Sequence, residues 1–107
     1  MKNLFLGCYS LNSIDLSKFD TSQVTNMNSM FSRCLRITSL NLNNIKTSNV
    51  DNMKNMFKGC ISLISLDLSK FDTSQVTNME GIFSNCISLM KLQISNINVR
   101  SVKTMAL

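Results

Sequence analysis

Four cysteines are the residues of this chain best suited to chemistry, and they occur at positions 8, 34, 60 and 86. A thiolate can act as a nucleophile, and paired thiols can hold a metal ion or form a disulfide. Zinc sites favour close pairs such as C-x2-C, whereas these cysteines are 26 residues apart. Each cysteine also follows an apolar pattern. We therefore expect no metal site and a column of buried, reduced thiols, with disulfides in a secreted protein as the alternative.

The other groups that enzymes use are missing or badly spaced. Histidine, the commonest general base, does not occur among the 107 residues. There is no glycine-rich phosphate loop, no Ser or Cys at a plausible spacing from a base, and no carboxylate pair with an evident pocket. We predict that the chain is not an enzyme, has no catalytic residues and uses no cofactor.

The spacing of the cysteines belongs to an internal repeat. Phenylalanine, valine and methionine return with the same 26-residue period, for example at Phe5, Phe31, Phe57 and Phe83. Self-similarity at this period is typical of a stacked repeat protein. We expect residues 1–107 to form a single array with units at approximately 5–30, 31–56, 57–82 and 83–107. The chain starts and stops within a unit, so we also expect it to be a piece of a longer array.

The first half of each unit has the period of a strand. In the third unit Leu63, Leu66 and Leu68 form the L-x-x-L-x-L pattern of a leucine-rich repeat, and polar residues alternate with leucine from 65 to 69. This alternation indicates a half-buried strand. The spacing predicts a parallel sheet of four short strands, centred near Ile14, Leu40, Leu66 and Leu92.

The second half of each unit has apolar residues spaced like one face of a helix. In the third unit they are Val76, Met79, Ile82, Phe83 and Cys86. Asp, Thr and Ser residues precede this pattern and are typical helix N-caps. We expect helices that begin near Ser22, Ser48 and Ser74 and end near Cys34, Cys60 and Cys86. The predicted fold is an α/β leucine-rich-repeat solenoid of about four 26-residue strand–helix units, with the parallel sheet on one side and the helices on the other.

One segment is long and specific enough to indicate a family. The sequence FDTSQVTNM occurs at 19–27 and again at 71–79. With the flanking residues it closely resembles the BspA-like leucine-rich repeat of bacterial surface proteins, also known as the mycoplasma-type lipoprotein repeat. The resemblance covers nearly the whole chain. It implies a surface-exposed or lipid-anchored protein that adheres to host cells, matrix proteins or other microbes.

The outward side chains of the strands are the candidate binding residues. They form polar columns, and we predict that they bind a protein partner, such as a host or matrix protein: Ser13, Asp15, Ser17, Ser39, Asn41, Asn43, Ser65, Asp67, Ser69, Lys91, Gln93 and Ser95. Four strands about 4.8 Å apart with three exposed residues each give a face of about 300 Å². A standard interface buries roughly 800 Å² per partner, so these repeats alone should bind weakly.

Two alternatives remain open. The array could be a structural spacer or self-associating stalk, because its ends carry uncovered apolar residues: Leu4, Phe5 and Leu6 at one end and Ile94, Ile97, Val99 and Val102 at the other. The formal net charge of +5 could instead support weak binding of an anionic glycan or nucleic acid. The basic residues are scattered, which argues against nucleic acid.

The sequence carries no direct sign of location. No apolar run reaches the roughly 18 residues that a membrane span needs. The apolar part of the first eight residues is too short for a signal peptide, and Phe5 and Cys8 are already in register with the later units. We expect no signal peptide, anchor or membrane span in this chain. A cell-surface or secreted location is therefore implied by the family resemblance alone.

Overall fold

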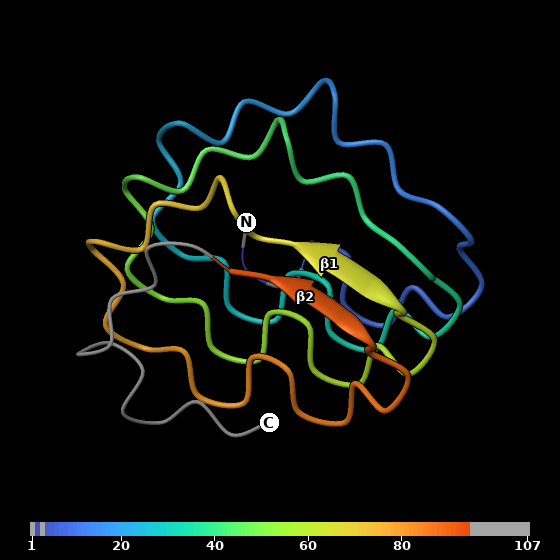
Figure 1. Ribbon diagram of the computed structural model, residues 1–107. Coiled ribbons are helices and arrows are strands. Elements are labelled where there is room, and N and C mark those ends of the chain that lie inside the picture. Colours follow the sequence, from blue (N-terminus) through green and yellow to red (C-terminus); the bar gives the residue numbers. More distant parts are fainter. Residues whose placement is uncertain (1, 3, 95–107) are drawn as a thin grey trace.

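The computed structural model describes residue 2 and residues 4–94. The chain runs in successive 26-residue lengths, which we call coils, and each coil lies beside the next (Figure 1). Two strands are present in the described residues, β1 (Ser65–Asp67) and β2 (Lys91–Gln93). They pair in parallel, with Leu66 opposite Leu92. On another side of the coils, isolated parallel bridges join Asn26 to Asn52 and Asn52 to Asn78.

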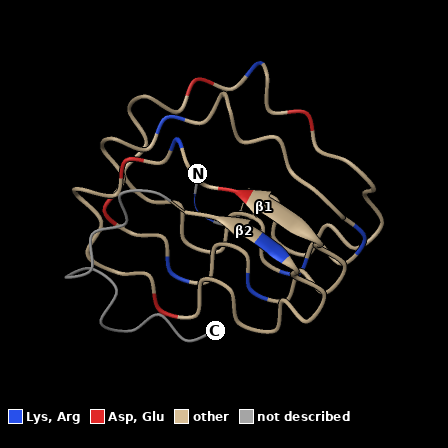
Figure 2. Cartoon of the chain, viewed as in Figure 1, with Lys and Arg blue, Asp and Glu red and all other residues tan. Residues whose placement is uncertain are grey.

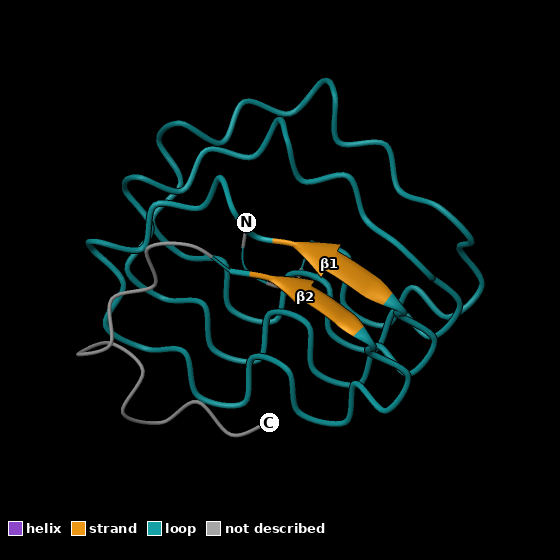
Figure 3. Ribbon diagram, in the orientation of Figure 1, coloured by secondary structure: helices purple, strands orange, loops and turns teal. Residues whose placement is uncertain are grey.

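The prediction of helices is wrong for the described residues. The three segments expected to be helical between residues 22 and 86 are turns and loops (Figure 3). In residues 27–33 and 53–59 every second N–H points to the next coil: Met27 donates to the Asn52 carbonyl at 2.8 Å, and Ser29 donates to the Lys54 carbonyl at 2.9 Å. The intervening Met30 N–H donates to the Met27 carbonyl at 3.2 Å, three residues back. The bonds to the fourth preceding carbonyl that define an α-helix are replaced by this alternation.

Left-handed residues explain why no helix forms. Ser29 has φ 57° and Arg33 has φ 61°, and a right-handed helix cannot continue through such residues. The same two positions are left-handed in the neighbouring coils, at Asn55 and Gly81 and at Gly7, Gly59 and Asn85. A short series of turns therefore returns the chain to the core every three or four residues. Its apolar spacing imitates that of a helix face.

The predicted sheet is shorter than expected. Strands occur at Leu66 and Leu92, but the segments around Ile14 and Leu40 are not strands. The α/β strand–helix solenoid is therefore corrected to coils made mainly of turns, with one two-stranded parallel sheet in the described residues. The expected helix from about Arg100 lies outside the described residues.

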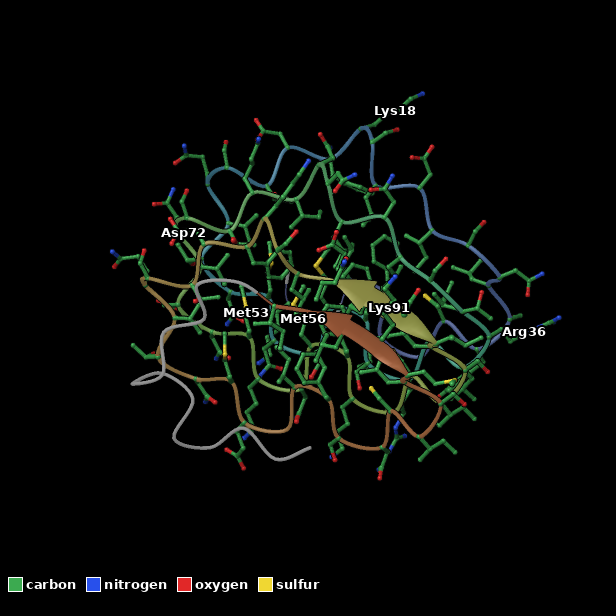
Figure 4. All side chains as sticks on the ribbon, viewed as in Figure 1. Lys18, Arg36, Met53, Met56, Asp72 and Lys91 are labelled. Atoms are coloured by element: carbon green, nitrogen blue, oxygen red, sulfur yellow. The ribbon has the colours of Figure 1, made fainter. Side chains whose placement is uncertain are left out.

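The core is a set of columns that run across the coils. Phe5, Phe31, Phe57 and Phe83 stack nearly parallel, with ring centroids 5.6, 5.7 and 6.1 Å apart. The repeated methionines at the inward positions fill the core, since Met53 and Met56 are fully buried and lie in the interior (Figure 4). Burial of these apolar side chains against the next coil is what makes a single coil depend on its neighbours.

Buried threonines also join the coils. The Thr21 hydroxyl accepts a hydrogen bond from the Lys46 N–H at 2.7 Å and donates to the Lys46 carbonyl at 3.0 Å. Thr47 makes the same two bonds with Asp72, at 2.9 and 3.1 Å. A buried hydroxyl thus satisfies both polar groups of one backbone residue in the next coil.

We predict that Gly81→Ala lowers the free energy of unfolding by about 1–3 kcal/mol, because a residue with a Cβ is strained at positive φ. Gly81 has φ 65°, and the new Cβ would also collide with the Asn55 side chain, which must move. Urea denaturation followed by circular dichroism measures the change.

Arg33→Gly is the matched control for this substitution. It relieves a left-handed arginine and should raise stability by up to about 1 kcal/mol. A stabilising Gly81→Ala together with a destabilising Arg33→Gly would contradict the turn geometry.

Candidate binding face

The cysteines are hydrogen-bonded parts of the core. The Cys60 thiol donates to the Phe31 carbonyl of the preceding coil at 3.1 Å. Cys34 and Cys86 make the equivalent bonds, at 3.3 and 3.1 Å. Cys34 and Cys60 are fully buried, while Cys8 and Cys86 are partly buried, and all four thiols are free. The column therefore has a structural role that accounts for its regular spacing.

Burial suppresses the reactivity of the Cys34 and Cys60 thiols. Burial raises the pKa of Cys60 from an ordinary 9.0 to about 12, and the neighbouring Cys34 adds to the effect. Burial likewise raises the pKa of Cys34 to about 11. A nucleophile or metal ligand must be a thiolate, which these environments disfavour. Within residues 4–94 no cluster of three or more His, Cys, Asp or Glu side chains could hold a metal ion.

The predicted face residues lie mostly at the surface. Eleven of the twelve are described, and Ser95 lies outside the described residues. Ser65 is half-buried, and the other ten are exposed: Ser13, Asp15, Ser17, Ser39, Asn41, Asn43, Asp67, Ser69, Lys91 and Gln93. The charges of this set are mixed, because Asp15 and Asp67 are acidic and Lys91 is basic. Figure 2 shows an acidic residue at the end of β1 and a basic residue at the start of β2.

Short side chains on this face form local turns with the backbone. Asp15 Oδ1 accepts the N–H of Ser17 at 2.9 Å, and Asp67 Oδ1 accepts the N–H of Ser69 at 2.9 Å. Asn41 Oδ1 does the same for Asn43 at 3.0 Å, which shows that an amide replaces the carboxylate in this role. The hydrogen bond from the Ser17 N–H holds the pKa of Asp15 below its ordinary value, and a weaker contribution comes from the Ser17 hydroxyl. Hydrogen bonds from Ser69 lower the pKa of Asp67 in the same way.

A shallow depression brings four of the predicted residues together. It has a volume of about 130 Å³ and lies between the strand-like segments of the first two coils. Asp15, Ser17, Asn41 and Asn43 line it, together with Ile14, Leu16 and Asn44. No backbone hydrogen bond among the described residues joins 13–15 to 39–41, which explains both the missing strands and the opening.

Asn44 is the residue of this site that sequence reasoning missed. Its Nδ2 group lies 2.9 Å from the Leu16 carbonyl, 3.1 Å from that of Ser17 and 3.1 Å from that of Phe19. Asn44 thus ties the floor of the depression to the first coil. The neighbouring units have lysine at the equivalent positions, 18 and 70. The change from lysine to asparagine at this repeat position was the sequence signal that could have indicated the contact. The short amide of asparagine reaches nearby backbone carbonyls, whereas the amino group of lysine lies at the end of a long side chain.

These features define a repeat protein whose 26-residue coils are joined by backbone bonds and by columns of Phe, Cys and Thr. The chain belongs to the family described as "Mycoplasma protein of unknown function, DUF285", which matches residues 1–107. A comparison with curated proteins found no match. No helix among the described residues is long and apolar enough to cross a membrane.

One solved structure is similar in fold. It is a leucine-rich cell surface protein from Faecalibacterium prausnitzii A2-165, with a TM-score of 0.61 and 24% sequence identity. The similarity covers 92% of this chain and 24% of that protein, so this chain spans about a quarter of its length. The expected relation to surface repeat proteins is therefore supported by a shared fold, although the predicted strand–helix units are not present in the described residues.

We predict that the stability of the native protein falls as the pH rises above the ordinary thiol pKa of 9.0, toward the raised values of about 11 and about 12. Unfolding releases the thiols to ionise, so the stability contributed by the protonated buried thiols is present below pH 9.0 and is lost above it. Urea midpoints measured across this range should fall less steeply for the Cys34→Ala, Cys60→Ala double variant. Equal slopes for the two proteins would contradict the prediction.

We also predict that the local turns of Asp15 and Asp67 make part of the protein's stability sensitive to acid. Because the folded-state pKa of Asp15 and Asp67 is lowered from 3.8, their contribution is present above that value and is lost as the pH falls through the folded pKa. Melting temperatures of the Asp15→Asn, Asp67→Asn variant should depend less on pH between neutrality and about pH 2. Its melting temperature at neutral pH should exceed that of the matched alanine variant, since Asn41 shows that asparagine keeps the turn.

Proposed function

We propose that this chain is a non-enzymatic binding module of a surface repeat protein of the BspA-like type. Its polar face, around the depression between the first two coils, binds a protein partner. The observation that carries the proposal is that Asp15, Ser17, Asn41 and Asn43 line one opening in the surface. These residues come from two coils, so a ligand seated there would contact both.

The division of roles between side chains supports this proposal. The Phe, Cys and Thr columns join the coils, whereas the side-chain bonds of Asp15, Asn41 and Asp67 are local. Replacing the outer polar groups would leave the contacts between coils in place. A surface whose composition is independent of its framework is suited to recognition.

The surface location is supported by the similar fold of a cell surface protein and by the family resemblance. For adhesion, the small polar face sets a limit, because about 300 Å² lies well below the roughly 800 Å² of a standard interface. One copy of the chain should bind weakly, and linked copies should bind by avidity. Extracellular matrix proteins are the class of partner we propose.

The test compares two substitutions in the same kind of local turn. Ser17→Arg places a large side chain in the depression, whereas Ser74→Arg places one after Asp72, whose Oδ1 accepts the Ser74 N–H at 3.0 Å. We expect a tandem array of the chain to bind an immobilised panel of matrix proteins. Ser17→Arg in every copy should weaken that binding at least about tenfold, because the arginine occupies the depression and excludes the partner. Ser74→Arg should leave the binding unchanged.

Two results would contradict this assignment. Equal binding by both variants would remove the depression from the site. Self-association of the chain without any ligand, seen by sedimentation over a wide concentration range, would favour the spacer or stalk. Leu4 and Leu6 in the first coil, exposed to 45% and 48%, are the residues that favour this second candidate.

A further inference from the structure

A second surface of the molecule combines exposed apolar and basic side chains. It lies on the bends that lead into β1 and β2, at the margin of the stacked coils (Figure 1). Ile61 and Ile64 are 39% and 47% exposed, and Ile87 and Met90 in the next coil are 79% and 86% exposed. We call this surface the bend edge and define it as residues 32–38, 58–64 and 84–91.

The apolar side chains of the bend edge are in register. Ile87 lies one repeat after Ile61, and Met90 lies one repeat after Ile64. The Met90 N–H donates to the Ile64 carbonyl at 2.8 Å, so the two bends are in direct contact. These residues therefore form one apolar ridge, and large exposed apolar surfaces mark sites of interaction.

The charges of the bend edge have a single sign. Arg33, Arg36, Lys58 and Lys91 lie within its three segments, which contain no Asp or Glu. Arg36 extends outward at this margin, as Figure 4 shows. Acidic side chains of the described chain lie elsewhere: Asp15, Asp20, Asp51, Asp67, Asp72 and Glu80. The only ion pair among the described residues joins Lys54 to Glu80 at 3.6 Å and leaves the four bend-edge cations outside it.

We propose that the bend edge docks this protein on an anionic lipid surface. Side chains that protrude from successive bends present their tips together to a flat partner. Aliphatic tips can enter the boundary between headgroups and acyl chains, while lysine and arginine contact anionic headgroups. Charge complementarity selects an anionic membrane, because the edge is basic throughout. An acidic protein is the competing occupant.

The expected strength is modest and measurable. Each basic residue near an anionic bilayer strengthens binding by about fivefold, and partial insertion of the apolar tips adds to this. Docking is therefore reversible and sensitive to salt, since the electrostatic part is screened within a Debye length. The polar face begins at Ser65, directly after one bend, and shares Lys91 with the bend edge, so docking would hold that face close to the membrane.

The experiment is flotation of the 107-residue chain with vesicles of equimolar phosphatidylcholine and phosphatidylglycerol, alongside vesicles of phosphatidylcholine alone. We expect binding to the anionic vesicles that declines with salt and little binding to the neutral ones. Ile87→Ser with Met90→Ser should weaken it at least about fivefold by removing the inserted tips, while Ile87→Leu with Met90→Leu should retain it.

A charge-matched pair of variants separates the edge from the net charge of the molecule. Arg36→Glu with Lys58→Glu should reduce vesicle binding at least about tenfold. Lys46→Glu with Lys70→Glu changes the net charge equally on exposed residues outside the bend edge and should have a much smaller effect. Circular dichroism confirms that each variant is folded. Equal losses from the two pairs, or equal binding to neutral vesicles, would overturn the proposal. Binding of polyglutamate without binding of vesicles would overturn it in favour of an acidic protein partner.

Discussion

The hydrogen bond from one coil to the next is the interaction on which the rest of this structure depends. Alternate N–H groups, such as those of Met27, Ser29 and Phe31, donate to the adjacent coil at 2.8–2.9 Å. The groups between them close tight turns within their own coil. A buried backbone polar group must have a partner, and here half of the partners belong to another repeat. Each coil is therefore completed only by its neighbour, and the stacking of the Phe and Cys columns follows from that.

This arrangement explains which features the sequence could predict. The 26-residue period, the inward columns of Phe, Met and Cys, and the alternation around Leu66 all record which side chains face the core. Facing the core is a property that pattern analysis detects directly. The secondary structure between the core positions was not determined in the same way. The apolar residues from Val76 to Cys86 are spaced by 3, 3, 1 and 3 positions. This spacing fits one face of a helix, and it fits the inner side of a series of turns just as well.

The decisive residues for that choice have no strong sequence signal. Left-handed backbone at Gly59 and Gly81 fits glycine, but the equivalent positions in other coils hold Arg33, Asn55 and Asn85. Arginine in particular favours helices, so the sequence conceals the turn. The candidate site was hidden for a related reason. The depression depends on two strand-like segments that do not pair and on Asn44, whose amide bridges to carbonyls of the preceding coil. Such a contact exists only once the register of the coils is known.

Because the columns lie inside the coils, the residues that hold the coils together are separate from the residues of the two surfaces. Backbone bonds, aromatic stacking and thiol donors lie inside, and the polar face and the bend edge lie on surfaces that these contacts do not use. The two surfaces meet where Ile64 is followed by Ser65 and at Lys91, which belongs to both. Because side chains alternate along a strand, a step of one residue changes the direction in which a group points. A repeat of this kind can therefore carry an apolar, basic edge and a polar face along the same coils. Substitution on one surface leaves the framework under the other intact.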